Sequence, residues 1–193
     1  MSANLFSQTT SKALFLDRDG VINVNHGYVG RIEDFNFIPG IFELCKAAQD
    51  RGYRLIIVTN QSGIARGYYT QKDFAKLSRW VEHAFWKRGI RITHTYHCPH
   101  HPKQRGPFGF NRTCRKPKPG MLIKAQQQFR INMHESIMVG DSLSDMRCAQ
   151  RAGVGKAVYL SHRSPGFTPR LLEQRSKKPY YRASHLSTIL PLL

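Results

Sequence analysis

The stretch Ala13-Leu14-Phe15-Leu16-Asp17-Arg18-Asp19-Gly20 indicates both a fold and a place for chemistry. Its four apolar residues predict a short buried strand with two aspartates, Asp17 and Asp19, at the carboxyl end. Side chains two apart on an extended segment project to the same side, so both carboxylates would face one ligand. A polar turn after a strand has the same pattern, because Asp-Gly is common in turns. The rest of the chain must decide between the two interpretations.

Two adjacent carboxylates suit the hydrolysis of a phosphate ester. One aspartate can attack phosphorus as a nucleophile. The other can protonate the leaving oxygen and later deprotonate the attacking water. Like charges this close repel, which calls for a cation, and magnesium is the usual ion for carboxylate and phosphate oxygens.

Apolar runs alternate with helical patterns along the chain. Further strands are predicted at 54–58, 90–96, 135–139 and 156–160, and helices at 41–51, 70–87, 119–130 and 146–152. Residues 25–37 are polar and irregular, and predict a small flap over the tip of the first strand. The alternation predicts an α/β fold with a parallel sheet and helices on both faces.

Polar side chains follow three of these strands. Thr59 and Asn60 follow the second strand and can hydrogen-bond phosphate oxygens, and Asp141 follows a later one. Parallel sheets bind ligands at the carboxyl ends of their strands, where Asp17 and Asp19 also lie. This convergence favours a functional site over a turn.

Length and composition predict one domain over residues 1–193, with a core at about 12–160 and a basic C-terminal extension at 161–193. In that extension only residues 185–193 are apolar enough to dock on a core. No apolar run has membrane-spanning length, and the first twelve residues lack the apolar core of a signal peptide. We expect a cytosolic monomer.

The formal net charge is +18, and residues 103–130 hold eight Lys or Arg and no acid. Such a field attracts anions: a phosphorylated small molecule, a nucleic acid or a membrane surface. A basic surface that only aids solubility is the plain alternative, above all for the C-terminal cluster.

Four cysteines occur, at positions 45, 98, 114 and 148. In a chain of this length without a secretory signal, they favour a metal site or free thiols over a disulfide framework.

Taken together, these motifs resemble those of the haloacid dehalogenase (HAD) superfamily of phosphatases. The matching motifs are Asp17-x-Asp19-Gly-Val, the strand ending at Thr59, the basic residue Lys116, and Gly140-Asp141-x-x-x-Asp145. Longer segments resemble the heptose bisphosphate phosphatases and the related histidinol-phosphate phosphatases. These segments are His26-Gly27-Tyr28-Val29, Thr59 to Gly67, Cys98-Pro99-His100-His101-Pro102 and Cys114 to Met121.

The resemblance implies a HAD-like fold with a minimal cap, and a role for each matching residue. Asp17 would be the nucleophile and Asp19 the general acid/base. Thr59, Asn60 and Lys116 would hold the phosphoryl group, and Arg115 with Lys116 would meet the substrate's anionic end. Magnesium would bind Asp17, the backbone carbonyl of Asp19, and Asp141. Asp145 would brace Lys116 or its own turn.

The resemblance also implies a zinc loop, with Cys98, His100 and Cys114 as ligands. Arg112 stands where the family pattern has its remaining cysteine, so His97, His101 or water would have to supply the fourth ligand. Asn25 likewise stands where the family often has an aspartate.

The implied function is removal of the 7-phosphate of D-glycero-D-manno-heptose 1,7-bisphosphate, in making lipopolysaccharide core sugar. Histidinol phosphate or another small phosphate ester is the alternative substrate. A non-catalytic basic protein that binds nucleic acid through this fold is the third interpretation.

Overall fold

A single twisted sheet organises the computed structural model, which describes residues 10–101, 113–161, 170–172 and 180–193. Within these ranges the strands lie in the order β3 (Ile92–Cys98), β2 (Tyr53–Asn60), β1 (Lys12–Leu16), β4 (Ile137–Gly140), β5 (Lys156–Leu160), β7 (Tyr180–Ala183) and β6 (Arg170–Leu172). All neighbours pair in parallel except β6 and β7, which are antiparallel. The predicted parallel α/β sheet is confirmed.

The register of β1 with its two neighbours positions the site. Leu16 pairs with Ile57 of β2 and with Val139 of β4, and the Asp17 N–H continues the ladder by donating to the Val139 carbonyl at 3.0 Å. The carboxyl ends of these three strands therefore meet at one edge of the sheet, as the sequence predicts.

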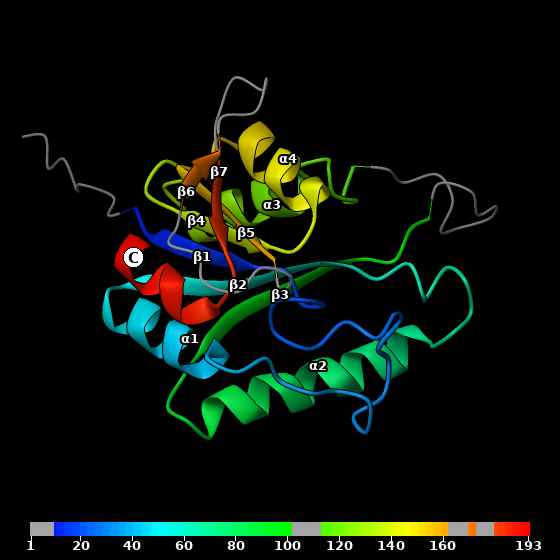
Figure 1. Cartoon of the computed structure of the whole chain (residues 1–193). Coiled ribbons are helices and arrows are strands. Elements are labelled where there is room, and N and C mark those ends of the chain that lie inside the picture. The colour runs from blue at the N-terminus through cyan, green and yellow to red at the C-terminus, as the bar shows by residue number, and fades with distance from the viewer. Residues whose placement is uncertain (1–9, 102–112, 162–169, 173–179) are drawn as a thin grey trace, which may run out of the picture.

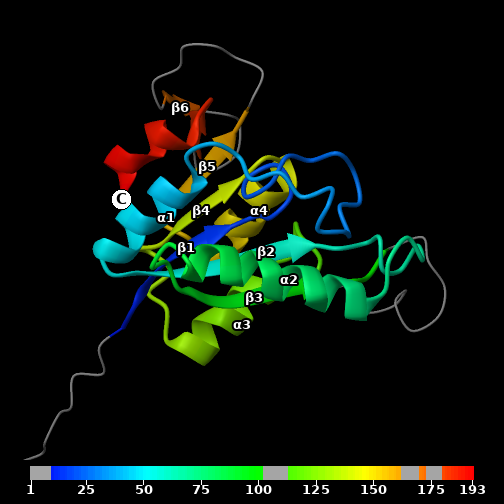
Figure 2. The same ribbon diagram turned by 90° about the horizontal axis from the view of Figure 1, so that it is seen from below.

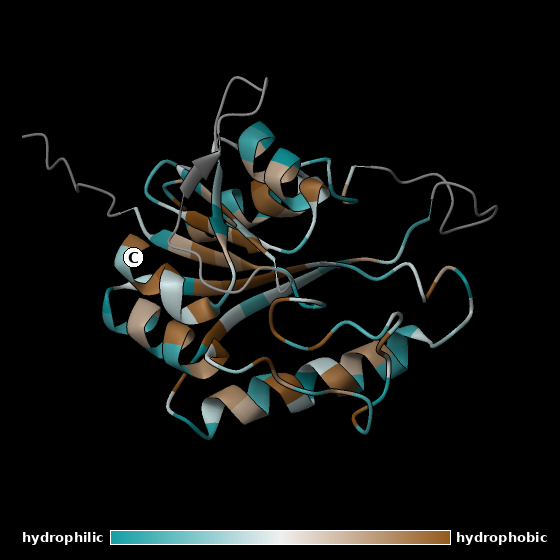
Figure 3. Cartoon of the chain, viewed as in Figure 1, coloured by the Kyte–Doolittle hydropathy of each residue, from teal (hydrophilic) through white to brown (hydrophobic). Residues whose placement is uncertain are grey.

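Helices cover both faces of the sheet (Figures 1 and 2). One face carries α1 (Ile41–Asp50), α2 (Gln71–Trp86) and the 3-10 helix η1 (Leu186–Leu192), and the other carries α3 (Gly120–Phe129) and α4 (Leu143–Ala152). Alternate residues of β1 feed the two cores: Leu14 and Leu16 pack on the first face, Ala13 and Phe15 on the second. Figure 3 shows the apolar residues concentrated in the strands and on the inward sides of the helices.

Two helices begin at side-chain caps. Thr70 caps α2, and its hydroxyl accepts from the Asp73 N–H at 3.1 Å. The other capped helix, α4, starts at Leu143, three residues earlier than predicted, because Ser142 is its cap and Asp145 completes the capping box. This earlier start brings the N-terminus of α4 to the edge where the site lies.

Residues 25–37 form no helix or strand, as predicted for a flap. The flap is nevertheless anchored, because Val29 and Phe35 are buried and the Phe35 ring lies 5.7 Å from that of Trp80 on α2.

The C-terminal part of the chain adds to the sheet beyond the last strand predicted from sequence. Strand β7 pairs with β5, and Tyr180 and Ala183 are buried. The apolar terminal segment docks as predicted, with Leu186 and Ile189 fully buried beside α1. None of the helices in the described residues is long and apolar enough to cross a membrane.

If residues 180–193 belong to the same cooperative unit as the rest, truncating a buried side chain there lowers global stability. We expect Ile189→Ala to lower the free energy of unfolding by about 2–5 kcal/mol in urea titrations, because it leaves a cavity in the core. The neighbouring exposed change, Ser187→Ala, should stay within about 0.5 kcal/mol of wild type. Equal stabilities of the two variants would show that this segment lies outside the folding unit.

Candidate active site

A buried lysine lies at the centre of the carboxyl edge of the sheet. Lys116 is 3% exposed, and its ammonium contacts Asp17 Oδ1 at 2.8 Å, Asp145 Oδ1 at 2.7 Å and the Val58 carbonyl at 2.8 Å. Burial opposes the positive charge, but the carboxylates of Asp17 and Asp145 outweigh that effect and raise the pKa of the lysine. Lys116 is therefore a fixed cation at the end of β1.

Asp17 is held in place and stripped of most of its water. Its side chain is paired with Lys116, and its Oδ1 accepts the Arg18 N–H at 2.7 Å. Burial raises the pKa of the Asp17 carboxyl to about 8, against the opposing effect of Lys116. Such a carboxyl calls for a second cation beside it to hold it ionised.

Asp145 braces Lys116 and its own turn, as the sequence predicts. One oxygen pairs with the lysine, and the other accepts from the Ser142 hydroxyl at 2.6 Å and the Ser142 N–H at 3.2 Å. A Cβ on Gly140 would lie 2.3 Å from the Asp145 Cβ, so only glycine leaves room for this carboxylate.

Asp141 faces the loop that follows β1. A Cβ on Gly20, whose φ is +85°, would lie 1.9 Å from Asp141 Oδ2, so the absence of a side chain there admits the carboxylate. Burial and the neighbouring Asp145 raise the pKa of Asp141. One oxygen from each of Asp17, Asp141 and Asp145 lies within 4.8 Å of the others. With Asp145 committed to Lys116, the other two carboxylates form a donor set that fits magnesium.

Thr59 and Asn60, from the end of β2, take different positions. Thr59 is 1% exposed and lines the same pocket as Asp17, and its oxygen accepts from the Gln61 side chain at 2.8 Å. The amide of Asn60 makes two bonds to the Lys116 backbone, at 3.1 and 3.2 Å, and so ties β2 to the lysine's loop. A direct contact between Asn60 and phosphate stays a prediction.

Three side chains that the sequence did not single out hold Asp19. Arg18 makes bonds of 2.9 and 3.0 Å to its two oxygens, Asn23 donates at 3.1 Å and Gln61 at 2.9 Å. The only signal in the sequence was their position in the same polar turns as Asp19 and Thr59.

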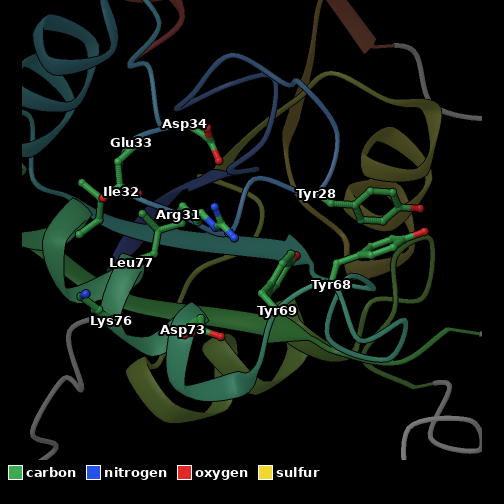
Figure 4. Close-up of a pocket in the computed structure, with 11 residues that line it drawn as sticks. Tyr28, Arg31, Ile32, Glu33, Asp34, Tyr68, Tyr69, Asp73, Lys76 and Leu77 are labelled. Carbon is green, nitrogen blue, oxygen red and sulfur yellow. The ribbon is translucent and has the colours of Figure 1, made fainter.

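These residues line a cavity of about 390 Å³ at the strand ends. Its walls are Asp17, Asp19, Asn25, Gly27, Tyr28, Thr59, Asn60, Ser62, Tyr69, Lys116, Asp141, Ser142 and Ser144. An adjoining cavity of about 300 Å³, between the flap and α2, shares Tyr28 and Tyr69 with it (Figure 4). The two together offer room for a ligand larger than phosphate.

The loop after β3 brings the three predicted zinc ligands together. His100 Nδ1 lies 3.6 Å from the Cys98 sulfur and 3.3 Å from that of Cys114, and the structure pairs the two cysteines as a disulfide. The expectation that the cysteines form no disulfide is therefore wrong for this pair in the structure. Cys45 and Cys148 are free and buried.

Neither histidine proposed as a fourth ligand belongs to this cluster. His97 points to the other face of β3, where its ring lies 4.3 Å from that of Phe74, and His101 lies 2.9 Å from Arg66. Arg112 and Pro102 lie outside the described residues, as does much of the basic sequence.

Arg115, the remaining predicted site residue, lies beside His100 and donates to its carbonyl at 3.1 Å. Burial and the nearby Arg66 lower the pKa of its guanidinium, and Tyr28 opposes that shift. The Arg66 guanidinium lies 5.6 Å from the Tyr28 ring, which in turn lies 4.5 Å from the Tyr68 ring. Arg66 therefore lies beside Tyr28, a wall residue of both cavities, and Arg115 lies near these two residues.

Two aspartates at the end of β1, a buried lysine paired with one of them, and carboxylates after β4 form the arrangement expected of a phosphatase of the HAD type. A family profile described as HAD-hydrolase-like matches residues 113–189. A D-glycero-beta-D-manno-heptose-1,7-bisphosphate 7-phosphatase from Yersinia pestis is 44% identical over 154 residues, covering 79% of this chain and 82% of that protein. A D-glycero-alpha-D-manno-heptose-1,7-bisphosphate 7-phosphatase from Campylobacter jejuni is 50% identical, covering 78% and 83%.

Solved structures agree with these relatives. A HAD-like phosphatase from Mesorhizobium loti superposes with a TM-score of 0.82 at 31% identity, over 94% of this chain and 85% of that one. The D,D-heptose 1,7-bisphosphate phosphatase from B. bronchiseptica, complexed with magnesium and phosphate, has the same fold, with a TM-score of 0.77 at 22% identity over 94% and 97%. This chain belongs to the D-glycero-D-manno-heptose-1,7-bisphosphate 7-phosphatase family, phosphoric monoester hydrolases of the HAD superfamily. The resemblance seen in the sequence is confirmed.

The close approach of Gly20 and Asp141 gives a sharp test of the site. We expect Gly20→Ala to lower kcat/KM for hydrolysis of the phosphate ester on the order of 100-fold, because the added methyl displaces the Asp141 carboxylate by an ångström or more. Gly52→Ala is the matched control: its φ is +80° but nothing lies within 4 Å of the added carbon. Similar activity losses in both variants would mean that backbone strain alone, not the Asp141 contact, explains the effect.

Proposed function

We propose that this chain hydrolyses the 7-phosphate of D-glycero-D-manno-heptose 1,7-bisphosphate, with magnesium, through an aspartyl-phosphate. The observation that carries the proposal is the buried ion pair between Asp17 and Lys116, at the floor of a cavity that also holds Asp19 and Asp141. The names of relatives at 40–50% identity support the substrate.

The residues divide the reaction between them. Asp17 attacks phosphorus, so a bond forms between its carboxylate oxygen and phosphorus as the bond from phosphorus to the sugar oxygen breaks. Asp19 gives its proton to that leaving oxygen. Asp19 then takes a proton from water as water attacks the phosphoryl group, which leaves as phosphate and restores Asp17.

The positive charge for these steps comes from two sources. Lys116 and the Thr59 hydroxyl would hold the phosphoryl oxygens as negative charge builds on them. Magnesium, held by Asp17, Asp141 and the Asp19 backbone carbonyl, would neutralise the same oxygens and keep Asp17 ionised when bound.

The two arginines near Tyr28, a wall residue of the cavity, support a substrate with a second anionic group. Within the described residues, neither Arg66 nor Arg115 forms an ion pair with a carboxylate. Guanidinium groups match phosphate geometry, so these two would receive the 1-phosphate while the 7-phosphate meets Asp17. Histidinol phosphate has no second phosphate to use them.

The substrate is tested by measuring magnesium-dependent phosphate release from both anomers of the heptose bisphosphate and from histidinol phosphate. Both anomers are needed because the relatives include enzymes named for each. We expect release from one or both heptose esters, more slowly from histidinol phosphate, and loss of release in Asp17→Asn because the nucleophile is gone. A preference for histidinol phosphate would overturn the proposed substrate, and activity in Asp17→Asn would overturn the mechanism.

The second-phosphate contact is tested with Arg66→Gln. We expect KM for the bisphosphate to rise on the order of tenfold to 100-fold, because a charge-assisted contact is lost. For heptose 7-phosphate, which lacks the 1-phosphate, the change should be much smaller. Arg91→Gln, an exposed arginine before β3 at the opposite edge of the sheet, is the control. Equal KM changes for the two substrates would argue against the contact.

We also propose that Cys98, His100 and Cys114 bind zinc when the thiols are reduced, with water completing the site. Support comes from the soft donor set and the short distances within it. Bound zinc would hold the loop that carries Arg115 and Lys116. A cytosolic location and a monomeric state stay predictions.

Metal analysis of protein purified under reducing conditions tests the zinc site. We expect about one zinc per chain, lost in Cys114→Ser because a ligand is removed, and kept in Cys45→Ser. Wild-type protein that holds no zinc under these conditions, with its thiols reduced, would overturn the zinc site.

A further inference from the structure

Asp19, the proposed acid/base, accepts hydrogen bonds from Gln61 and Arg18, to which the proposed reaction assigns no role. We infer that Gln61 is a positioning residue that aims Asp19 at the leaving oxygen and aligns it with Thr59. This inference rests on the proposed function, since it assigns a role within the same reaction.

Gln61 joins the two parts of the site through one amide nitrogen. Its Nε2 donates to Asp19 Oδ2 at 2.9 Å and to Thr59 Oγ1 at 2.8 Å, and the side chain is almost fully buried, with 1% of the residue exposed. Because the Thr59 oxygen accepts this bond, its own hydrogen is left to point at a phosphoryl oxygen. The bridge therefore fixes the distance between the proton donor and the phosphoryl-binding hydroxyl.

Tyr69 fixes which way the Gln61 amide faces. The Tyr69 hydroxyl donates to Gln61 Oε1, which leaves only Nε2 to face Asp19 and Thr59. A Cβ on Gly30 or on Gly63 would lie 2.5 or 2.4 Å from the Tyr69 ring, so the ring fits a slot between the flap and the loop after β2. The tyrosine is therefore itself held in place by the backbone on both sides.

Arg18 also holds Asp19 in place. The residue is 2% exposed, and its guanidinium bonds both Asp19 oxygens and donates to the Val29 carbonyl of the flap at 2.6 Å. With Arg18 bonded to both oxygens and Gln61 to Oδ2, Asp19 is held in one orientation, and that orientation depends on the flap being in place.

The effect of holding Asp19 in place should differ between substrates with poor and good leaving groups. In the first step Asp19 passes its proton to the sugar oxygen as the bond from that oxygen to phosphorus breaks, because a sugar alkoxide is a poor leaving group. A nitrophenolate leaves without that help. A misaligned Asp19 therefore slows cleavage of an alkyl ester much more than cleavage of an aryl ester.

The test compares kcat/KM of Gln61→Leu and wild type on heptose 1,7-bisphosphate and on p-nitrophenyl phosphate. The value of kcat/KM depends on the steps up to departure of the leaving group and not on the later hydrolysis of the aspartyl-phosphate. We expect a loss on the order of 100-fold for the sugar ester. The loss for the aryl ester, which reflects only the Thr59 contact, should be at least about tenfold smaller.

Two further variants keep the test decisive. Tyr69→Phe keeps the ring in its slot but frees the Gln61 amide to turn, and should show the same selectivity with a smaller loss. Gln49→Leu is the control, because the Gln49 amide also bridges two groups, the Gly89 carbonyl and the Arg91 N–H, but lies at the amino edge of the sheet. It should change neither rate.

Equal losses on the two esters in Gln61→Leu and Tyr69→Phe would overturn the inference, because a general structural effect slows both reactions alike. No loss on either ester would overturn it as well. If wild-type protein cleaves histidinol phosphate and not the heptose ester, the proposed substrate fails, but the same comparison of an alkyl with an aryl ester still tests Gln61.

Discussion

The ammonium of Lys116, shared between two buried aspartates, is the interaction on which the rest of the site depends. A buried cation needs anionic partners, and a buried carboxylate needs a cation. Because Asp17 follows β1 and Asp145 lies in the first turn of α4, the lysine ties together segments distant in sequence. Loss of either carboxylate would leave the lysine with unbalanced charge at the floor of the cavity.

The need to bring carboxylates close to the buried Lys116 accounts for the glycines and the amide around this lysine. Gly140 admits Asp145, Gly20 admits Asp141, and Asn60 clasps the Lys116 backbone with both ends of its amide. Each of these features brings polar groups closer than ordinary side chains allow. The fold thus supplies a rigid floor on which one cation, Lys116, lies among carboxylates that leave room for a second cation.

Much of this arrangement could be predicted from the sequence. Strand periodicity and the position of acids after apolar runs predict that Asp17, Thr59 and Asp141 meet at one edge, because parallel strands share a direction. The contacts of Gln61 with Asp19 and of Asn60 with the Lys116 backbone could not be predicted, since these partners lie 42 and 56 residues away. Strand β7 was also missed, because it is short and follows a basic, polar segment without periodicity.

The central claim is that Asp17, paired with Lys116, takes the phosphoryl group covalently. It is tested most directly by acid-quenching the enzyme during turnover of the heptose bisphosphate and mapping phosphorylated peptides by mass spectrometry. We expect one phosphoryl group, on Asp17, which disappears when substrate is exhausted. An active enzyme that carries the group on another residue, or that never carries it at any quench time, would contradict a covalent role for Asp17.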